Sequence, residues 1–222
     1  MRSAIVSLSS SAASSGPRIM ESTWYASLRQ SLKKNERARE SRYFQVASVD
    51  SQGRPTNRTV VYRGFLPTPD GRVDENVLTF VTDRRSEKVS HFQRVPWTEV
   101  AWYMPATREQ YRISGKVRVV TDETTDAALS KARTMAWRNM SDPGRQQFLW
   151  PEPGVARTGD GDGEAQYDVD AAELPTKDDP VAPAFCLCCV EVDRVSLLSL
   201  KSNERVDFEK VDGTWHATRV NP

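Results

Sequence analysis

The feature that most constrains this chain is a series of short strand-like segments between residues 43 and 120. Each segment is rich in β-branched and aromatic residues, and turn-forming residues separate it from the next. A short helix is expected at Val89–Gln93. The expected strands are Tyr43–Val49, Asn57–Phe65, Val77–Thr82, Glu99–Met104 and Glu109–Val120. This spacing favours an antiparallel barrel over βαβ units.

Helices and further strands are expected on either side of this series. Thr23–Glu40 and Asp122–Asn139 carry apolar residues at helical spacing, and Thr23 can cap the first of these helices. The chain should end in two strand regions, Phe185–Leu200 and Arg205–Val220, the second interrupted by a hairpin turn at Asp212-Gly213. The sequence therefore predicts a mainly β protein with peripheral α-helices.

Length and composition set the domain organisation. The 222 residues suffice for one domain, expected at 21–222, plus tails. Residues 1–20 are rich in serine and contain no acidic residue, which fits a disordered tail or an organelle transit peptide equally well. The chain would be cytoplasmic in the first case and plastidic or mitochondrial in the second. Residues 151–180 carry nine acidic and two basic residues and should form a flexible surface excursion.

Charge and hydropathy disfavour two classes of partner. A net charge of +1 gives no strong field toward nucleic acid or an anionic membrane. No apolar run approaches the roughly 18 residues that a membrane-spanning helix needs. The three cysteines, Cys186, Cys188 and Cys189, lack a second ligand pair at zinc spacing. They indicate a buried strand rather than a metal site, and their odd number favours a reducing compartment.

Three clusters of polar residues could carry chemistry. Residues 57–63 place Arg58 and Arg63 on opposite faces of a strand. Residues 82–88 gather hydroxyls, two arginines and a lysine around a turn before a helix, which suits a phosphate. Residues 107–115 begin a strand with Gln110, whose amide can both donate to and accept from a heterocycle. Taken alone, the first cluster is better interpreted as an exposed edge strand and the second as a charged, capped helix start, and the third could be a plain polar strand start.

Taken together, the order and spacing of these clusters resemble the pyridoxamine 5′-phosphate oxidase family, and its plant and cyanobacterial branch most closely. The residues that carry the resemblance are Arg58–Arg63, the Thr-Asp-Arg-Arg-Ser-Glu-Lys turn and Arg-Glu-Gln-Tyr-Arg-Ile-Ser-Gly. The ending also fits, with Trp215 four residues before Arg219 and a final Pro222. The resemblance implies an FMN-binding split β-barrel of antiparallel Greek-key type, working as a homodimer with FMN at the interface.

The resemblance also implies a set of site residues. Gln110 would reach the cofactor across the dimer interface, and Arg205 would lie near the flavin ring. Glu87 stands where the oxidase has arginine, and Arg84 or Arg85 would compensate. The substrate phosphate would be held by Arg63, assisted by Arg138 or Lys201. The full cofactor-binding set is Arg58, Thr59, Val60, Val61, Arg63, Thr82, Arg84, Arg85, Ser86, Lys88, Gln110 and Arg205.

The implied activity is oxidation of pyridoxamine or pyridoxine 5′-phosphate to pyridoxal 5′-phosphate by dioxygen, a step of vitamin B6 metabolism. No side chain stands out as a catalytic base, and His91 and His216 are interpreted as structural or exposed. The family's substrate-phosphate signature is not reproduced, and its Arg-x-His motif appears only as Lys201-Ser202-Asn203. Two alternatives therefore stay open: an FMN-dependent reductase of another small substrate, and a non-catalytic binding protein for FMN or pyridoxal phosphate.

Overall fold

A computed structural model describes residues 23–156 and 174–222 of the chain. The predictions for 1–20 and for most of the acidic excursion fall outside these residues. The helices are α1 (Trp24–Lys34), α2 (Glu87–Arg94), α3 (Ala127–Arg138) and α4 (Asp142–Gln146), with short 3₁₀ turns η2 (Arg39–Arg42) and η3 (Gln147–Leu149). The strands are β1 (Tyr43–Val49), β2 (Pro55–Pro67), β3 (Val73–Asp83), β4 (Trp97–Met104), β5 (Glu109–Val120), β6 (Phe185–Ser199), β7 (Glu204–Val211) and β8 (Thr214–Val220).

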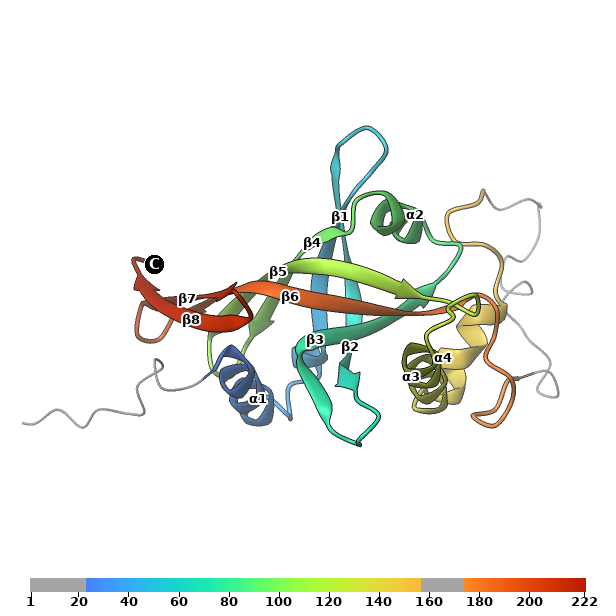
Figure 1. The fold of residues 1–222 in the computed structure, drawn as a ribbon, viewed down its shortest axis with the longest axis horizontal. Helices are drawn as coiled ribbons and strands as arrows, with labels where there is room; N and C mark the ends of the chain where they lie inside the picture. Colours follow the sequence, from blue (N-terminus) through green and yellow to red (C-terminus); the bar gives the residue numbers. More distant parts are fainter. Residues whose placement is uncertain (1–22, 157–173) are drawn as a thin grey trace, which may run out of the picture.

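The described strands form one antiparallel sheet that closes on itself. The order β3-β2-β1-β4-β5-β6 becomes a six-stranded barrel because β3 also pairs with β6. Strands β1 to β3 follow one another, and α2 then leads β4 back to lie beside β1, which is a Greek-key connection. In Figure 1, α3 and α4 lie together near one end of β6, and the β7–β8 hairpin extends beyond the other end. The predicted fold class is confirmed.

The barrel interior is filled by side chains that alternate along the strands. Phe44 of β1 lies within aromatic contact of Phe80 and Trp102, and all three are fully buried. Trp24 and Leu28 of α1 belong to the same cluster, so this helix is held by its apolar face. No helix in the described ranges combines the length and apolarity needed to cross a bilayer.

Local hydrogen bonds explain where the predicted helices begin and end. Thr23 caps α1 as expected, accepting from the backbone N–H of Ala26. The helix ends at Lys34 rather than Glu40, because Asn35 turns its side chain back onto the carbonyl of Ser31. Helix α3, expected from Asp122, begins only at Ala127, because the carboxylate of Asp126 accepts from the N–H groups of its first turn.

The C-terminal strands agree closely with the sequence pattern. Asp212 and Gly213 have φ angles of 48° and 81°, so the β7–β8 turn uses the left-handed region at both positions. The three cysteines are free and buried in β6, which confirms their interpretation as strand residues. Burial raises the pKa of Cys186 to about 11 and that of Cys189 to about 12, so these thiols are poor nucleophiles at neutral pH.

Candidate functional site

A cleft opens where β2 and β3 separate. Residues 62–67 of β2 pair with β3, and the last pair on this side joins Tyr62 to Phe80. Beyond it β3 continues along β6 through Asp83, whereas residues 55–61 of β2 pair with β1. In the described chain, the other edge of this part of β2 therefore has no strand partner, and a cavity of about 1240 Å³ lies against it. The backbone N–H and C=O groups along this edge of β2 are available to a ligand.

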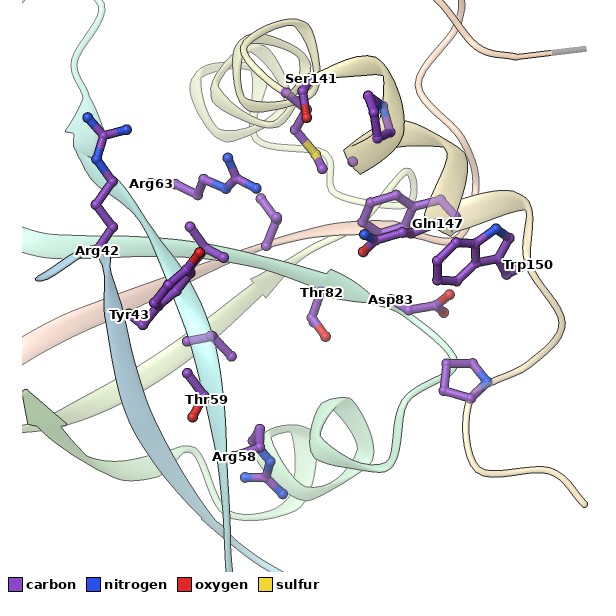
Figure 2. A pocket seen from close by; sticks show the side chains of 18 of the residues that line it. Arg42, Tyr43, Arg58, Thr59, Arg63, Thr82, Asp83, Ser141, Gln147 and Trp150 are labelled. Atoms are coloured by element: carbon purple, nitrogen blue, oxygen red, sulfur yellow. The ribbon is translucent and has the colours of Figure 1, made fainter. Parts of the chain in front are cut away.

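The cleft has three walls that come from distant parts of the sequence. One wall is formed by β2, the end of β3 and the start of α2. A second comes from residues 36–43, which include η2 and lead into β1. The third is α4, η3 and residues 150–155. Figure 2 shows Gln147 and Trp150 on this third wall, with Thr82 and Asp83 of β3 below them.

Two cations converge at the α2 end of the cleft. Lys88 donates to Thr82 Oγ1 at 2.9 Å, and the Ser86 hydroxyl lies 3.3 Å from that same oxygen. Burial lowers the pKa of Lys88, and the positive charge of Arg58 lowers it further. Burial also lowers the pKa of Arg58. Within the described residues neither side chain makes an ion pair, so this end of the cleft is suited to an anion.

A third cation lies at the opposite end of the cleft. Arg63 projects from β2 on the same side as Ser141 of the loop before α4, whereas Arg58 lies beside α2 (Figure 2). No carboxylate of the described chain forms an ion pair with Arg63. The apolar side chains of Val61, Phe148 and Trp150 lie along the same cavity. The cleft thus offers two separate positions for anionic groups. It also has an apolar surface, formed by β2, η3 and Trp150.

The structure brings together most of the residues that the first two sequence clusters singled out. Ser86 is buried directly behind Thr82 and belongs to the same hydroxyl network. Seven of the predicted cofactor-binding residues line the cavity itself: Arg58, Thr59, Val60, Val61, Arg63, Thr82 and Lys88.

The two arginines expected to replace the missing phosphate partner are engaged elsewhere. Arg84 forms ion pairs with Asp122 at 2.7 Å and Glu123 at 2.5 Å, on the strand-to-helix turn before α3. Arg85 pairs with Asp83 at 2.7 Å and donates to the backbone carbonyl of Trp150. Neither Arg84 nor Arg85 lines the cavity, although the two partners of Arg85, Asp83 and Trp150, do.

Four further predicted residues lie away from the cleft of a single chain. Gln110 sits in β5 between Tyr103 and Leu198 of the neighbouring strands. Arg205 bonds to Asp207 and Ser196 within β6 and β7. The remaining two are Lys201, which donates to the carbonyl of Ala106, and Arg138, which is exposed on α3. Any contribution of these side chains to the cleft described here would have to come from a second copy of the chain.

Sequence reasoning missed two walls of the cleft. Arg42 and Tyr43 border it, but the basic run before β1 looked like the charged end of a helix. Gln147 and Trp150 follow a segment that folds back over the cleft because buried Arg145 bonds to the carbonyls of Met140 and Pro175. The sequence shows Arg145 four residues after Ser141, but no local pattern indicates that its guanidinium binds backbone carbonyls and not a ligand.

Comparisons with known proteins place this chain in a family. Residues 21–121 match the profile of the pyridoxamine 5′-phosphate oxidase, FMN-binding domain. The chain is 32% identical over 204 residues to pyridoxine/pyridoxamine 5′-phosphate oxidase 2 of Arabidopsis thaliana, covering 90% of this chain and 96% of that protein. The chain belongs to the pyridoxamine 5′-phosphate oxidase family and carries its FMN-binding domain.

Solved structures agree with this assignment. A pyridoxamine 5′-phosphate oxidase-related, FMN-binding protein from Nostoc punctiforme superposes with a TM-score of 0.79 at 33% identity, covering 90% of this chain and 98% of that one. PhzG from Burkholderia lata, solved with tetrahydrophenazine-1-carboxylic acid, has a TM-score of 0.70 at 20% identity, covering 89% and 91%. The second likeness concerns the fold. The first and the Arabidopsis relative match the plant and cyanobacterial branch expected from the sequence.

The lowered pKa of Lys88 gives the cleft a pH dependence. A phosphate bound beside the ammonium raises its pKa again, so phosphate affinity is full below the pKa of the free protein and falls as pH rises above it. We expect the ratio of FMN to riboflavin affinity, titrated by fluorescence from neutral pH to about pH 10, to fall before the ordinary lysine range is reached. Riboflavin lacks the phosphate and cancels the titration of the ring. In Lys88→Arg the ratio should stay constant over this pH range, because arginine keeps its charge. A constant ratio in the unmodified protein would contradict a contact between Lys88 and the phosphate.

Proposed function

We propose that this protein is an FMN-dependent oxidase that converts pyridoxamine or pyridoxine 5′-phosphate to pyridoxal 5′-phosphate with dioxygen. The observation that carries the proposal is a single cleft with unpaired cations at both ends, Arg58 with Lys88 at one and Arg63 at the other. A flavin phosphate and a substrate phosphate are two anions that need separate positions. The names of the Arabidopsis relative and the matched domain support the same reaction.

The residues present fit the phosphate end of FMN. Arg58 and Lys88 supply charge, and the hydroxyls of Thr59 and Thr82 supply further donors beside them. The unpaired edge of β2 can pair with the polar edge of a flat heterocycle, as a strand edge pairs with any extended donor and acceptor row. When bound, FMN supplies the acceptor for hydride and the means of returning electrons to dioxygen.

The side chains of this chain would then bind and orient. Arg63 holds the substrate phosphate and so fixes the distance of the reacting carbon from the cofactor. Val61, Phe148 and Trp150 cover the cleft with apolar surface and limit the access of water. The described cleft residues include no histidine, so proton transfer would rest on the substrate amine, on water or on a group of a second chain.

A second candidate function keeps the cofactor and changes the substrate. Of the three cations expected to hold a substrate phosphate, only Arg63 lines the cavity, and Lys201 and Arg138 do not. A cleft that keeps only one of the three expected substrate cations would also suit another small heterocycle reduced by FMN, or cofactor binding without turnover. Reactivity toward pyridoxamine phosphate and toward NAD(P)H separates these functions.

We also propose that the working form is a homodimer with the cleft at its interface. Tyr43, Trp97 and Tyr103 are 36%, 50% and 46% exposed on the outer side of β1 and β4, and Tyr43 also lines the cleft. Tyr43 and Tyr103 lie close together on neighbouring strands, so a second copy that packs on these rings would be able to bring Gln110 and Arg205 to the cleft. Analytical ultracentrifugation should find a dimer of about twice 25.0 kDa. A monomer at micromolar concentration would contradict this part of the proposal.

Removing either cation at the α2 end should weaken cofactor binding. Loss of one charge-assisted contact costs about 1.5–3 kcal/mol, so Arg58→Ala and Lys88→Ala should each lower FMN affinity roughly ten- to a hundredfold. Arg84→Ala is the matched control from the same turn, because its ion pairs lie outside the cavity. Flavin fluorescence quenching measures all three. Equal affinity in the two cleft variants and the control would refute this position for the phosphate.

The proposed reaction is tested with purified protein loaded with FMN. Pyridoxamine 5′-phosphate should yield pyridoxal phosphate and hydrogen peroxide, and Arg63→Met should raise KM for this substrate by about tenfold or more while FMN stays bound. Unphosphorylated pyridoxamine serves as the control, because its turnover should not depend on Arg63. Flavin reduction by NAD(P)H without product from the phosphate ester would favour the reductase, and neither reaction would favour a binding protein.

A further inference from the structure

A buried histidine is connected through one serine side chain to Arg58, at the α2 end of the cleft. His91 of α2 is 7% exposed, and its Nδ1 lies 3.0 Å from the hydroxyl of Ser48, which is 1% exposed in β1. The same hydroxyl accepts from Nη1 of Arg58 at 2.8 Å. His91 does not line the cleft, yet a single serine connects it to a guanidinium that does.

Arg58 is held by one edge of its guanidinium. Nη1 and Nη2 donate to the hydroxyls of Ser48 and Thr56 at 2.8 and 2.7 Å, and these two oxygens are 2.9 Å apart. Nη1 also reaches the carbonyl of Val46, which is the register partner of Arg58 in the β1–β2 ladder. The Nε–H has no partner within the described residues. The edge formed by Nε and Nη2, which suits bidentate contact with a phosphate, is therefore left for a ligand.

The count of protons gives His91 a defined part in this arrangement. The Ser48 oxygen accepts from Arg58, so its one hydroxyl proton must be donated elsewhere. Thr56 Oγ1 receives a proton from Arg58 Nη2 and can donate its own proton to the carbonyl of Ser48 at 3.3 Å. Nδ1 of His91 either accepts the Ser48 proton or, in the other tautomer with Ser48 donating to Thr56 Oγ1, donates to the Ser48 oxygen. In both arrangements the hydrogen bond from His91 fixes the orientation of the Ser48 hydroxyl beside Arg58.

We propose that His91 is a positioning residue for cofactor binding, acting through Ser48 to hold Arg58 with its free edge toward the phosphate. This inference rests on the proposed FMN site at Arg58 and Lys88. If the His91 side chain only fills space between α2 and the barrel, replacing it should change riboflavin affinity and FMN affinity by the same factor. A histidine that orients Arg58 affects only the part of affinity that depends on the phosphate.

The test compares FMN with riboflavin, which shares the ring and lacks the phosphate. His91→Phe removes the hydrogen bond to Ser48 and keeps a ring of similar size, whereas His91→Asn keeps an amide near the position of Nδ1 that can donate or accept. We expect His91→Phe to lower the ratio of FMN to riboflavin affinity about three- to tenfold, the effect of one hydrogen bond. His91→Asn should restore most of the ratio, and Ser48→Ala should lower it as His91→Phe does. The double variant Arg58→Ala/His91→Phe should lose no more than Arg58→Ala alone.

The outcomes separate this inference from the proposed function. If Arg58→Ala lowers the ratio and His91→Phe and Ser48→Ala do not, His91 has no positioning role although the cofactor site stands. Equal losses of FMN and riboflavin affinity in His91→Phe, or a full additional loss in the double variant, would also overturn the inference. An unchanged ratio in Arg58→Ala would overturn both proposals. Thermal melting of each variant identifies any that is not folded. If His91→Phe does not fold, His91→Leu, which also removes the hydrogen bond to Ser48, carries the test in its place.

Discussion

The separation of β2 from β3 after the Tyr62–Phe80 pair determines what this protein can bind. Up to that pair the two strands satisfy each other's backbone groups, and beyond it β3 is satisfied by β6 while one edge of β2 has no strand partner. A closed barrel has no such edge. The same split opens the cavity, places Arg58 and Arg63 along it and lets the start of α2 bring Lys88 to its end. Without the divergence, these side chains would cover an ordinary strand surface.

In the proposed function, charge assigns the two phosphate groups to opposite ends of the cleft. Two cations with lowered pKa values and no described ion pair are a cost in the empty protein, which a bound dianion offsets. Burial of a guanidinium alone is not a sign of a ligand. Arg145 is as buried as any arginine described here, yet backbone carbonyls and Asp142 satisfy it, and its role is to hold α4 against the cleft. The distinction lies in whether protein oxygens complete the hydrogen bonds.

The barrel could be predicted from the sequence because alternation and turn residues are local signals. Glu109–Val120 is a strand with the predicted limits, and Asp212-Gly213 forms the predicted turn. The first two binding clusters were recognisable because each lies on one strand or turn. The wall carrying Gln147 and Trp150 was not, because its place depends on Arg145 bonding to carbonyls up to thirty residues away in sequence. The ion pairs of Arg84 were not predictable for a similar reason, since Asp122 and Glu123 meet it only in the folded chain.

The central claim is that the cleft between β2 and β3 clasps a flavin phosphate. A crystal structure of the protein grown with FMN tests it most directly. We expect density for the phosphate within hydrogen-bonding distance of Arg58 and Lys88, with the ring system lying along residues 59–63 of β2. Density for FMN at another surface, or an empty cleft in crystals that are grown at saturating cofactor, would contradict it.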